Sequence, residues 1–285
     1  MTHTSHDFLS PVSLSDSDYK KVAEIVHELA GIHLHEGKRE LVVARLGKRI
    51  RQLGMKSVGD YLKYVRNEQT QDELVTMLDA LSTNLTAFWR ESQHFDYVSS
   101  VTLPRLVERA KRTEDWKIRL WSAGCSSGEE PYGLAMLILH HLEKPDRFDL
   151  KVLATDLSTK VLGIARSGVY SAERAKPIPS DIRSKYIQEV RTGYGVQYRV
   201  RPEVQSHVTF ARLNLMERWP MKGPMDFIFC RNVMIYFDKP TQERLVTRFY
   251  DMLRAGGTLF VGHSESLTGV EHSFRYVKPT IYEKP

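Results

Sequence analysis

The sequence predicts an α/β protein in which a small all-α domain precedes a mainly parallel, doubly wound sheet. Apolar residues recur at helical spacing from about residue 15 to residue 82. From Trp116 onward, short apolar strands alternate with amphipathic helices, as in doubly wound sheets. One of these strands also runs through a loop of small residues directly into a helix. With 285 residues, the chain is long enough for one large or two modest domains.

Residues 15–83 are predicted to form the helical domain, after a flexible N-terminus at residues 1–14. Ser15 or Ser17 can cap a first helix, which ends near Gly31. Three more helices are indicated by apolar residues at helical spacing: Val42, Val43, Leu46, Ile50 and Leu53; Tyr61, Leu62 and Val65; and Leu74, Met77, Leu78 and Leu81. Residues 84–115 are predicted to be a helical linker region.

The predicted sheet and its helices occupy residues 116–285. We expect strands at residues 117–122, 150–155, 208–211, 226–230 and 258–262, and helices at residues 129–142, 158–166 and 241–253. Residues 274–283 are predicted to close the sheet as a hairpin. Basic and β-prone residues alternate in Tyr194–Arg201, which predicts a small antiparallel β-subdomain inserted at about residues 188–206.

Composition argues against several classes of protein. The longest apolar run, Leu134–Leu139, is far shorter than the roughly 20 residues that span a bilayer. Met1–Ser13 contains no basic region followed by an apolar one, so we expect neither a signal peptide nor membrane insertion. The only cysteines, Cys125 and Cys230, lack metal-ligand spacing and are most simply small buried residues. A cytoplasmic protein with no metal and no disulfide is expected.

A loop of small residues joins the first predicted strand to its helix, within Trp121–Tyr132. Gly124 and Gly128 would let the backbone come within contact distance of a ligand, as in the nucleotide-type cofactor sites of open sheets. The helix begins with Glu129 and Glu130, whose carboxylates would repel a pyrophosphate at the positive end of the helix dipole. The loop therefore predicts a nucleoside ligand that carries positive charge, and S-adenosylmethionine is the clearest candidate.

Two further groups of polar residues could reach such a ligand. Asp156 ends the second strand, where doubly wound folds place an acid on ribose hydroxyls; a helix N-terminal cap is the alternative. Between the domains, Asn84 and Thr86 offer short hydrogen-bonding groups, and Arg90 offers a rigid fork suited to a carboxylate. The alternative for this second group is a polar helix start.

Another polar pair follows the predicted strand at residues 226–230. Arg231 and Asn232 would lie at the carboxyl edge of the sheet, where open sheets bind ligands. Tyr236 could face the same cleft or pack inside the domain. The segment His263-Ser-Glu265 has the letters of a catalytic triad, but adjacent residues cannot form that geometry, so we expect a polar turn there.

Together these residues resemble the chemotaxis-receptor glutamate methyltransferases, the CheR family. The resemblance covers nearly the whole chain, and five segments carry it in order: Thr83–Glu91, Ala123–Tyr132, Ala154–Asp156, Asn214–Leu215 and Phe229–Phe237. It implies a Rossmann-like S-adenosylmethionine-dependent methyltransferase domain with a small antiparallel β-subdomain insertion, preceded by an all-α N-terminal domain. The implied enzyme transfers a methyl group to glutamate side chains of chemoreceptor cytoplasmic domains for sensory adaptation and releases S-adenosylhomocysteine.

The resemblance also implies roles for single residues. Cofactor contacts fall, with Gly124 of the loop, on Asn84, Thr86, Arg90, Glu130, Asp156, Asn214, Leu215, Arg231 and Asn232. Arg90 would hold the methionine carboxylate and Asp156 the ribose. Asn232 and Tyr236 would be the catalytic residues that border the transferred methyl. A glutamate carboxylate, with a reference pKa of about 4.3, is already ionised at neutral pH, so the reaction needs placement rather than a general base.

The resemblance implies a partner, the helical bundle of a chemoreceptor, and a basic cluster in the helical domain could bind it. Between Lys38 and Arg66 there are nine Lys or Arg and only two acids. Arg45, Lys48, Arg49 and Arg51 fall on the arc of their helix that the apolar residues leave open. We expect this arc to bind an acidic receptor helix; a solvated helix face is the alternative. In some family members the β-subdomain docks a receptor C-terminal peptide, which is left open for this chain.

Two other functions are weighed against this one. An S-adenosylmethionine-dependent methyltransferase could act on another protein or on a small molecule, but a small substrate does not need a basic helical domain. A non-catalytic nucleic-acid module would want aromatic residues among the basic ones for stacking, and Lys38–Arg51 contains none. We therefore expect an enzyme that binds no nucleic acid and is a monomer.

Overall fold

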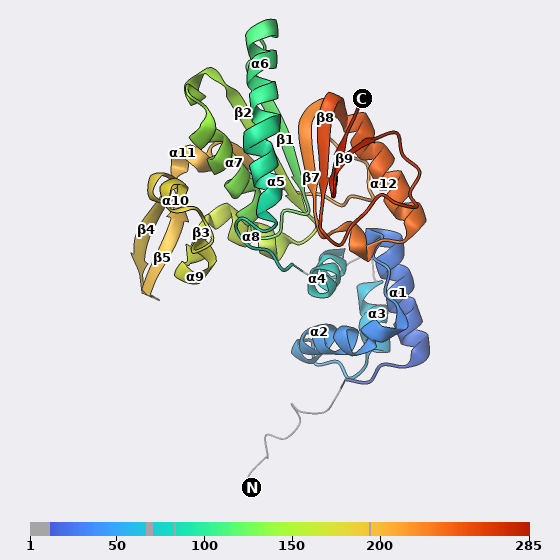
Figure 1. The fold of residues 1–285 in the computed structure, drawn as a ribbon. Helices are drawn as coiled ribbons and strands as arrows, with labels where there is room; N and C mark the ends of the chain where they lie inside the picture. Colours follow the sequence, from blue (N-terminus) through green and yellow to red (C-terminus); the bar gives the residue numbers. More distant parts are fainter. Residues whose placement is uncertain (1–11, 67–70, 83, 194) are drawn as a thin grey trace. The chain divides into compact units, whose positions relative to one another are not determined.

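The computed structural model describes residues 12–66, 71–82, 84–193 and 195–285 (Figure 1). The chain divides into two compact units. The helical unit comprises Met1–Thr83 together with Tyr236–Asp238, and the sheet unit comprises Asn84–Ile235 and Lys239–Pro285. In the described part of the chain, no helix is long and apolar enough to cross a membrane.

The helical unit contains the four predicted helices: α1 (Asp16–Ala30), α2 (Arg39–Gln52), α3 (Val58–Val65) and α4 (Gln71–Leu81), with a 3₁₀ turn, η2 (Glu36–Lys38), before α2. The hydroxyl of Ser15 accepts the N–H of Asp18 and caps α1, which ends at Gly31 with a left-handed φ of 70°. Apolar residues of the predicted helical pattern form the core of this unit. Val22, Val42, Leu46 and Ile50 are fully buried.

Part of the predicted flexible N-terminus packs on this unit. Residues 1–11 and Thr83 lie outside the described residues, but Val12 is buried and Ser13 forms a parallel bridge with Ser57. Residues 12–14 are therefore held by the helical unit, and that end of the predicted boundary moves toward the N-terminus.

The sheet unit is built on a sheet of seven strands in the order β6-β2-β1-β7-β8-β10-β9 (Figure 1). The strands are β1 (Lys117–Ala123), β2 (Asp149–Asp156), β6 (Val208–Arg212), β7 (Met225–Cys230), β8 (Leu253–Val261), β9 (Arg275–Lys278) and β10 (Ile281–Glu283). The first five are parallel, and β10 pairs antiparallel with β8 and with β9. The strand order reverses between β1 and β7, which is where doubly wound sheets bind their ligands.

Helices cover both faces of this sheet. On one face, α7 (Glu129–His141) contacts β1, β2 and β6, and nearly all of its residues are buried. On the other, Trp121 of β1 packs edge-on against Phe249 of α12 (Lys239–Met252). Further helical segments of the sheet unit are α8 (Thr159–Ser167), α9 (Ala172–Ala175), α10 (Ser180–Tyr186), α11 (Pro202–Gln205) and η5 (Pro145–Arg147). The turn η6 (Met234–Tyr236) ends at Tyr236, which groups with the helical unit.

The predicted helical linker is a continuous run of α5 (Ser92–Tyr97), a π-helical turn η4 (Val98–Thr102) and α6 (Leu103–Thr113). Phe95 and Leu106 on its inner side belong to the same apolar core as α7. The linker therefore packs as part of the sheet unit.

The predicted β-subdomain is a separate antiparallel sheet in the order β3-β5-β4. Its strands β4 (Ile187–Thr192) and β5 (Gly195–Val200) lie close to the predicted insertion, but β3 (Val169–Ser171) lies well before it. Tyr170 of β3 pairs with Tyr198 of β5. The inserted sheet thus draws on a longer stretch of chain than residues 188–206.

Candidate functional site

The loops that follow β1 and β2 are tied together at the carboxyl edge of the sheet. The backbone N–H groups of Gly124 and Cys125 both donate to the carbonyl of Thr155, at 2.8 and 2.9 Å. The buried Asp156 carboxylate accepts the N–H of Ser126 with one oxygen (2.8 Å) and the N–H of Ser158 with the other (2.9 Å).

Asp156 is not the cap of α8, because that role belongs to Ser158, whose hydroxyl accepts the N–H of Val161. The two backbone donors instead fix the orientation of the Asp156 carboxylate between two loops. A fixed, buried acceptor at the end of the second strand has the position that a ribose site requires.

At both loop glycines, Gly124 and Gly128, it is another part of the protein that comes close to the backbone. A Cβ on Gly124 (φ 82°) would lie 2.4 Å from the side chain of Val233, in the loop after β7. A Cβ on Gly128 (φ 93°) would lie 2.9 Å from both Ala165 and the hydroxyl of Tyr170. We predicted that these glycines let the backbone approach a ligand. In the structure, their lack of a side chain first allows the segments around the site to pack against each other.

Both acidic residues at the start of α7, Glu129 and Glu130, form ion pairs with arginines. Glu129 pairs with Arg174 and also accepts the hydroxyl of Ser127. Glu130 accepts the hydroxyl of Ser122 at 2.7 Å and the Nε–H of Arg231 at 2.7 Å. The electrostatic argument against a phosphate is correspondingly weaker than the sequence implied, since each carboxylate has an arginine beside it.

Arg231 is the centre of a buried network, with 3% of its side chain exposed. Besides Glu130, its guanidinium donates to the carbonyl of Arg90 at 2.6 Å and lies 3.4 Å from a carboxylate oxygen of Glu91. Its Nη1 also lies 3.3 Å from Nδ1 of His94. Arg231 therefore connects the end of β7 to the start of α7 and to the segment that carries Arg90.

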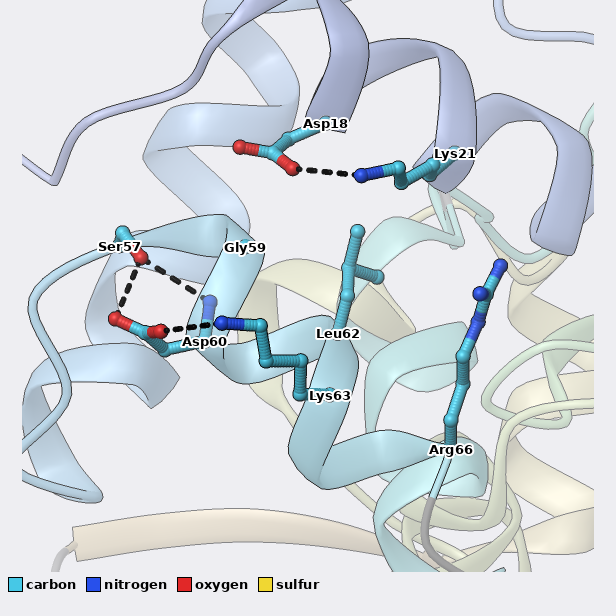
Figure 2. Close-up of a pocket in the computed structure, with 8 residues that line it drawn as sticks. All are labelled: Asp18, Lys21, Ser57, Gly59, Asp60, Leu62, Lys63 and Arg66. Carbon is cyan, nitrogen blue, oxygen red and sulfur yellow. Dashed lines mark hydrogen bonds and ion pairs between the residues drawn. The ribbon is translucent and has the colours of Figure 1, made fainter.

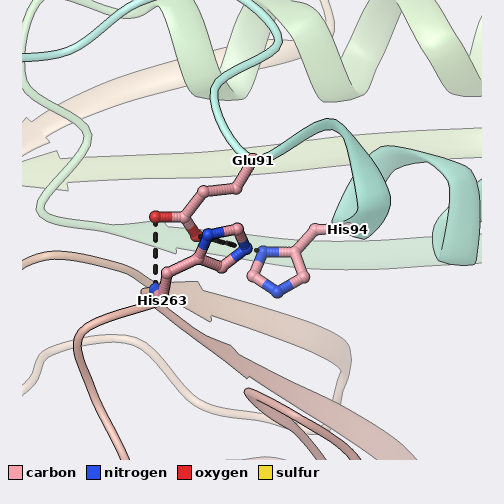
Figure 3. Close-up of side chains that lie close together, drawn as sticks. All are labelled: Glu91, His94 and His263. Atoms are coloured by element: carbon pink, nitrogen blue, oxygen red, sulfur yellow. Dashed lines mark hydrogen bonds and ion pairs between the residues drawn. The ribbon is translucent and has the colours of Figure 1, made fainter.

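Figure 3 shows the side chains of Glu91, His94 and His263 lying close together, and the first two are the residues beside Arg231. One ligand atom from each lies within 4.8 Å of the others, a spacing that could hold a metal ion. However, the Arg231 guanidinium already donates toward His94 and Glu91, so a metal would meet a fixed positive charge. We interpret this cluster as the support of Arg231.

The protonation state of His94 fits this interpretation. His94 is fully buried, and its Nε2 lies 2.7 Å from the hydroxyl of Thr280, which itself donates to the carbonyl of Pro279. Burial, with the charges of Arg231 and His263, lowers the pKa of His94 to about 3. A neutral ring that donates from Nε2 leaves Nδ1 as an acceptor toward Arg231.

The other predicted cofactor residues lie around the same edge. Asn84 accepts the hydroxyl of Ser126 on its carbonyl at 2.9 Å, and the half-buried Arg90 donates to the carbonyl of Leu85 at 2.8 Å. Thr86 is half-buried between them in the chain. Asn214 and Leu215 are buried just after β6, the strand beside β2. Asn214 and Leu215 thus follow a strand end, whereas Asn84, Thr86 and Arg90 lie on the segment before α5, which reaches the loop after β1 through Ser126.

The two predicted catalytic residues fall in different units. Asn232 belongs to the sheet unit and has a left-handed φ of 59°, which is uncommon outside glycine. Tyr236 groups with the helical unit, where its carbonyl accepts the N–H of His33 at 2.7 Å.

Both cysteines are buried and free, as predicted. Burial raises the pKa of the Cys125 thiol and of the Cys230 thiol well above the ordinary value. Neither supplies a thiolate nucleophile at neutral pH.

The sequence interpretation missed the role of Glu265. The expected turn is present, with the N–H of Glu265 donating to the carbonyl of Gly262, but the side chain of Glu265 is buried and accepts several backbone N–H groups. A signal was available, because this residue follows the strand that neighbours β7, and parallel strands end at the same edge. Arg174 and His94 were also missed, since their partners are distant in the sequence.

In the helical unit, two of the four predicted substrate-binding residues are engaged within the unit. Arg45 donates to the carbonyls of Leu81 and Ser82, at 2.7 and 2.8 Å. Arg49 forms a two-pronged ion pair with Glu73, which is buried and also accepts the hydroxyl of Tyr61. Lys48 and Arg51 are exposed and remain the better candidates for a receptor surface.

A surface pocket of about 400 Å³ also lies in the helical unit (Figure 2). Its lining residues are Asp18, Lys21, Ser57, Gly59, Asp60, Leu62, Lys63 and Arg66. Lys21 lies 3.6 Å from Asp18 and Lys63 lies 3.4 Å from Asp60, so four of its charged side chains form two ion pairs, each along one helix. Such exposed pairs contribute little energy, and we assign the pocket no chemistry.

Comparison with known families gives two matches that together cover most of the chain. Residues 17–82 match the CheR methyltransferase all-alpha domain, and residues 84–282 match the CheR methyltransferase SAM binding domain. The boundary between the matched regions coincides with the boundary between the two units.

Curated relatives match over nearly their full length. A chemotaxis protein methyltransferase of Borreliella burgdorferi is 36% identical over 286 residues, covering 100% of both chains. The chemotaxis protein methyltransferase of Escherichia coli is 39% identical over 273 residues, covering 95% of this chain and 92% of the relative. A probable chemotaxis protein methyltransferase of Rhizobium etli is 39% identical over 259 residues, covering 90% of this chain and 96% of the relative.

Proposed function

The chain belongs to the CheR methyltransferase family, and from this premise we propose that it methylates glutamate side chains on the cytoplasmic helical bundle of chemoreceptors. It is an S-adenosylmethionine-dependent methyltransferase of chemotaxis, with the all-α domain and the cofactor-binding domain that the sequence predicted. What remains to be proposed is the target side chain, the residues that carry the reaction and the manner of docking.

One observation carries the assignment of the site: the loops after β1, β2 and β7 meet at the point where the strand order reverses. We assign the ribose to Asp156, whose carboxylate two backbone N–H groups already orient. The methionine carboxylate is assigned to Arg90, whose segment Arg231 holds through a carbonyl. Asn84, Thr86, Gly124, Glu130, Asn214, Leu215, Arg231 and Asn232 complete the proposed cofactor site.

The residues present suit this cofactor chemically. Glu130 offers an acceptor near the start of a helix, and the fixed arginines offer donors for a carboxylate. When bound, S-adenosylmethionine supplies an electrophilic methyl group on a sulfonium. The protein then needs to bring an ionised glutamate in line with that methyl, and orientation of this kind can supply roughly 7–11 kcal/mol.

Asn232 and Tyr236 are proposed to border the transferred methyl, since both follow β7 on one short segment. Neither has to act as a base, because a glutamate is already ionised. Their proposed task is to exclude water and to limit the directions from which the carboxylate approaches.

We propose that an acidic receptor helix is recognised through Lys48 and Arg51, the exposed members of the predicted basic arc. In the inserted sheet, β4 is an edge strand, which could pair with an extended receptor C-terminal peptide. A monomer acting in the cytoplasm is consistent with such a substrate.

The proposed function is tested by incubating the protein with tritiated S-adenosylmethionine and receptor cytoplasmic fragments. Transfer to glutamate gives a methyl ester, so the label on the receptor should be released as methanol by mild alkali. A fragment in which the methylated glutamates are replaced by alanine should stay unlabelled. Label that resists alkali, or that appears equally on the substituted fragment, would contradict the assignment.

A further inference from the structure

The loop after β8 holds the loop after β7 through a single buried carboxylate. One oxygen of Glu265 accepts the N–H groups of Val233 and Ile235, at 2.9 and 3.1 Å. The other accepts the N–H of Asn232 at 2.8 Å and that of Gly262. Glu265 is only 6% exposed. One side chain thus satisfies three donors of the turn that carries Asn232, where no strand or helix partner serves them.

The surrounding residues fit this arrangement. Asn232 has a left-handed φ of 59°, a conformation that costs free energy for a residue with a side chain and persists only where neighbours enforce it. A Cβ on Gly262 would lie 2.6 Å from the side-chain nitrogen of Asn232, and 2.8 Å from both its backbone nitrogen and Glu265, so only glycine permits this approach. The N–H of His263 donates to Glu91 at 3.2 Å, which anchors the same loop on its other side (Figure 3).

Arg231, directly before this turn, is held by other groups. Its partners are Glu130, Glu91 and the carbonyl of Arg90. Apart from Glu91, which also accepts the N–H of His263, the groups that hold Arg231 are therefore distinct from those that hold the turn from Asn232 to Ile235.

We propose that Glu265 is a positioning residue for methyl transfer, which holds Asn232 and the following turn in the conformation that borders the reacting methyl. This inference rests on the proposed function, because it assigns Asn232 to that border. A displacement of about 1 Å in such a group can lower the rate about 100-fold. Of the assigned cofactor contacts, only the one at Asn232 depends on Glu265, whereas those at Arg231, Asp156 and Arg90 do not.

The first test compares Glu265→Gln with Glu283→Gln. Glutamine keeps the volume of Glu265 but turns an N–H donor toward backbone N–H groups, which leaves at least one of them without an acceptor. Glu283, on β10, is a matched control: it is also buried and paired, but its partners Arg105 and Arg275 lie on α6 and β9 and not in this turn. We expect Glu265→Gln to lower kcat about 10- to 100-fold while the Kd for S-adenosylhomocysteine changes less than about threefold.

Glu283→Gln should lower the unfolding temperature at least as much and keep kcat within about twofold of the wild type. If Glu265→Gln keeps kcat within twofold, or if kcat follows the loss of stability in both variants, the positioning role is wrong. A wild-type enzyme that labels no receptor would instead contradict the proposed function itself.

The second test needs no variant and no activity. Amide hydrogen exchange of the wild-type protein should show strong protection at Asn232, Val233 and Ile235, although these residues are in neither a strand nor an α-helix. Exchange at these three amides as fast as at the exposed residues Ser264 and Gly269 would overturn the inference even if Glu265→Gln fails to fold.

Discussion

Single carboxylates organise much of this site by accepting backbone N–H groups. Asp156 holds the loops after β1 and β2, and Glu265 holds the turn after β7. Each can satisfy several donors because an ionised carboxylate has two oxygens and donates nothing. The chemistry assigned to the site, transfer to an already ionised glutamate, then depends on how accurately these acids place their loops.

His94 gives a pH-dependent prediction at the same scale. Its folded-state pKa, about 3, lies below the ordinary value of 6.5 because burial and Arg231 disfavour the charged ring. The unfolded chain therefore binds the proton more strongly, so this contribution to stability is present above about pH 6.5 and is lost as the pH falls toward 3. Urea unfolding at pH 6 and pH 5 should show the wild type losing about 1 kcal/mol more than His94→Gln.

Glutamine retains a donor for Thr280 and an acceptor for Arg231, so the variant should fold. Equal pH dependence in the two proteins would mean that His94 is not held neutral.

At the scale of the element, α2 is fixed by its polar face as well as by its apolar one. Arg49 on α2 pairs with the buried Glu73 of α4, and Tyr61 of α3 donates to the same carboxylate. The Arg49 hydrogen bonds lower the pKa of Glu73. A residue that was predicted to face a receptor thus joins three helices of the helical unit.

Replacing Arg49 with methionine should therefore destabilise the helical unit. Glu73 would keep its buried charge without its main partner, and we expect a loss of about 2–3 kcal/mol in the free energy of unfolding. The matched control is Lys48→Met, one position earlier and exposed, which should change it by less than about 0.5 kcal/mol. Similar losses in both variants would contradict the buried pair.

Several elements could be predicted from the sequence because their signals are local. The cap at Ser15, the strand alternation and the loop glycines all fall where the sequence placed them. β3 could not be predicted, because its three residues carry no periodicity and its pairing with β5 is decided by the rest of the inserted sheet. The partners of Arg49 and Glu129 were missed for the same reason: each lies on a different element.

Two buried acids, Glu73 and Glu265, could have been recognised as structural residues from the sequence. Glu73 lies four residues before Met77 on the buried side of its helix, and an acid there indicates a buried partner. Glu265 follows β8, which neighbours β7, so the topology alone brings it to the turn that carries Asn232. For Glu265, its position after a strand end was thus more informative about its role than the resemblance of His263-Ser-Glu265 to a catalytic triad.

For the whole molecule, recognition of the receptor should depend on charge. Reversing Lys48 and Arg51 to glutamate should lower kcat/KM for a receptor fragment about tenfold at low salt, with a smaller effect at high salt, because screening weakens steering between exposed charges. Affinity for S-adenosylhomocysteine should stay unchanged. If kcat/KM holds at low salt, the receptor binds elsewhere.

The most direct test of the account is calorimetric titration with S-adenosylhomocysteine of the wild type, Asp156→Ala and Asp149→Ala. The two aspartates lie at opposite ends of β2, so the second variant controls for changes to the strand. If the carboxyl edge of the sheet holds the cofactor, Asp156→Ala should weaken binding at least about 100-fold, and Asp149→Ala should leave it within about twofold. Unchanged affinity in Asp156→Ala would contradict the proposed site.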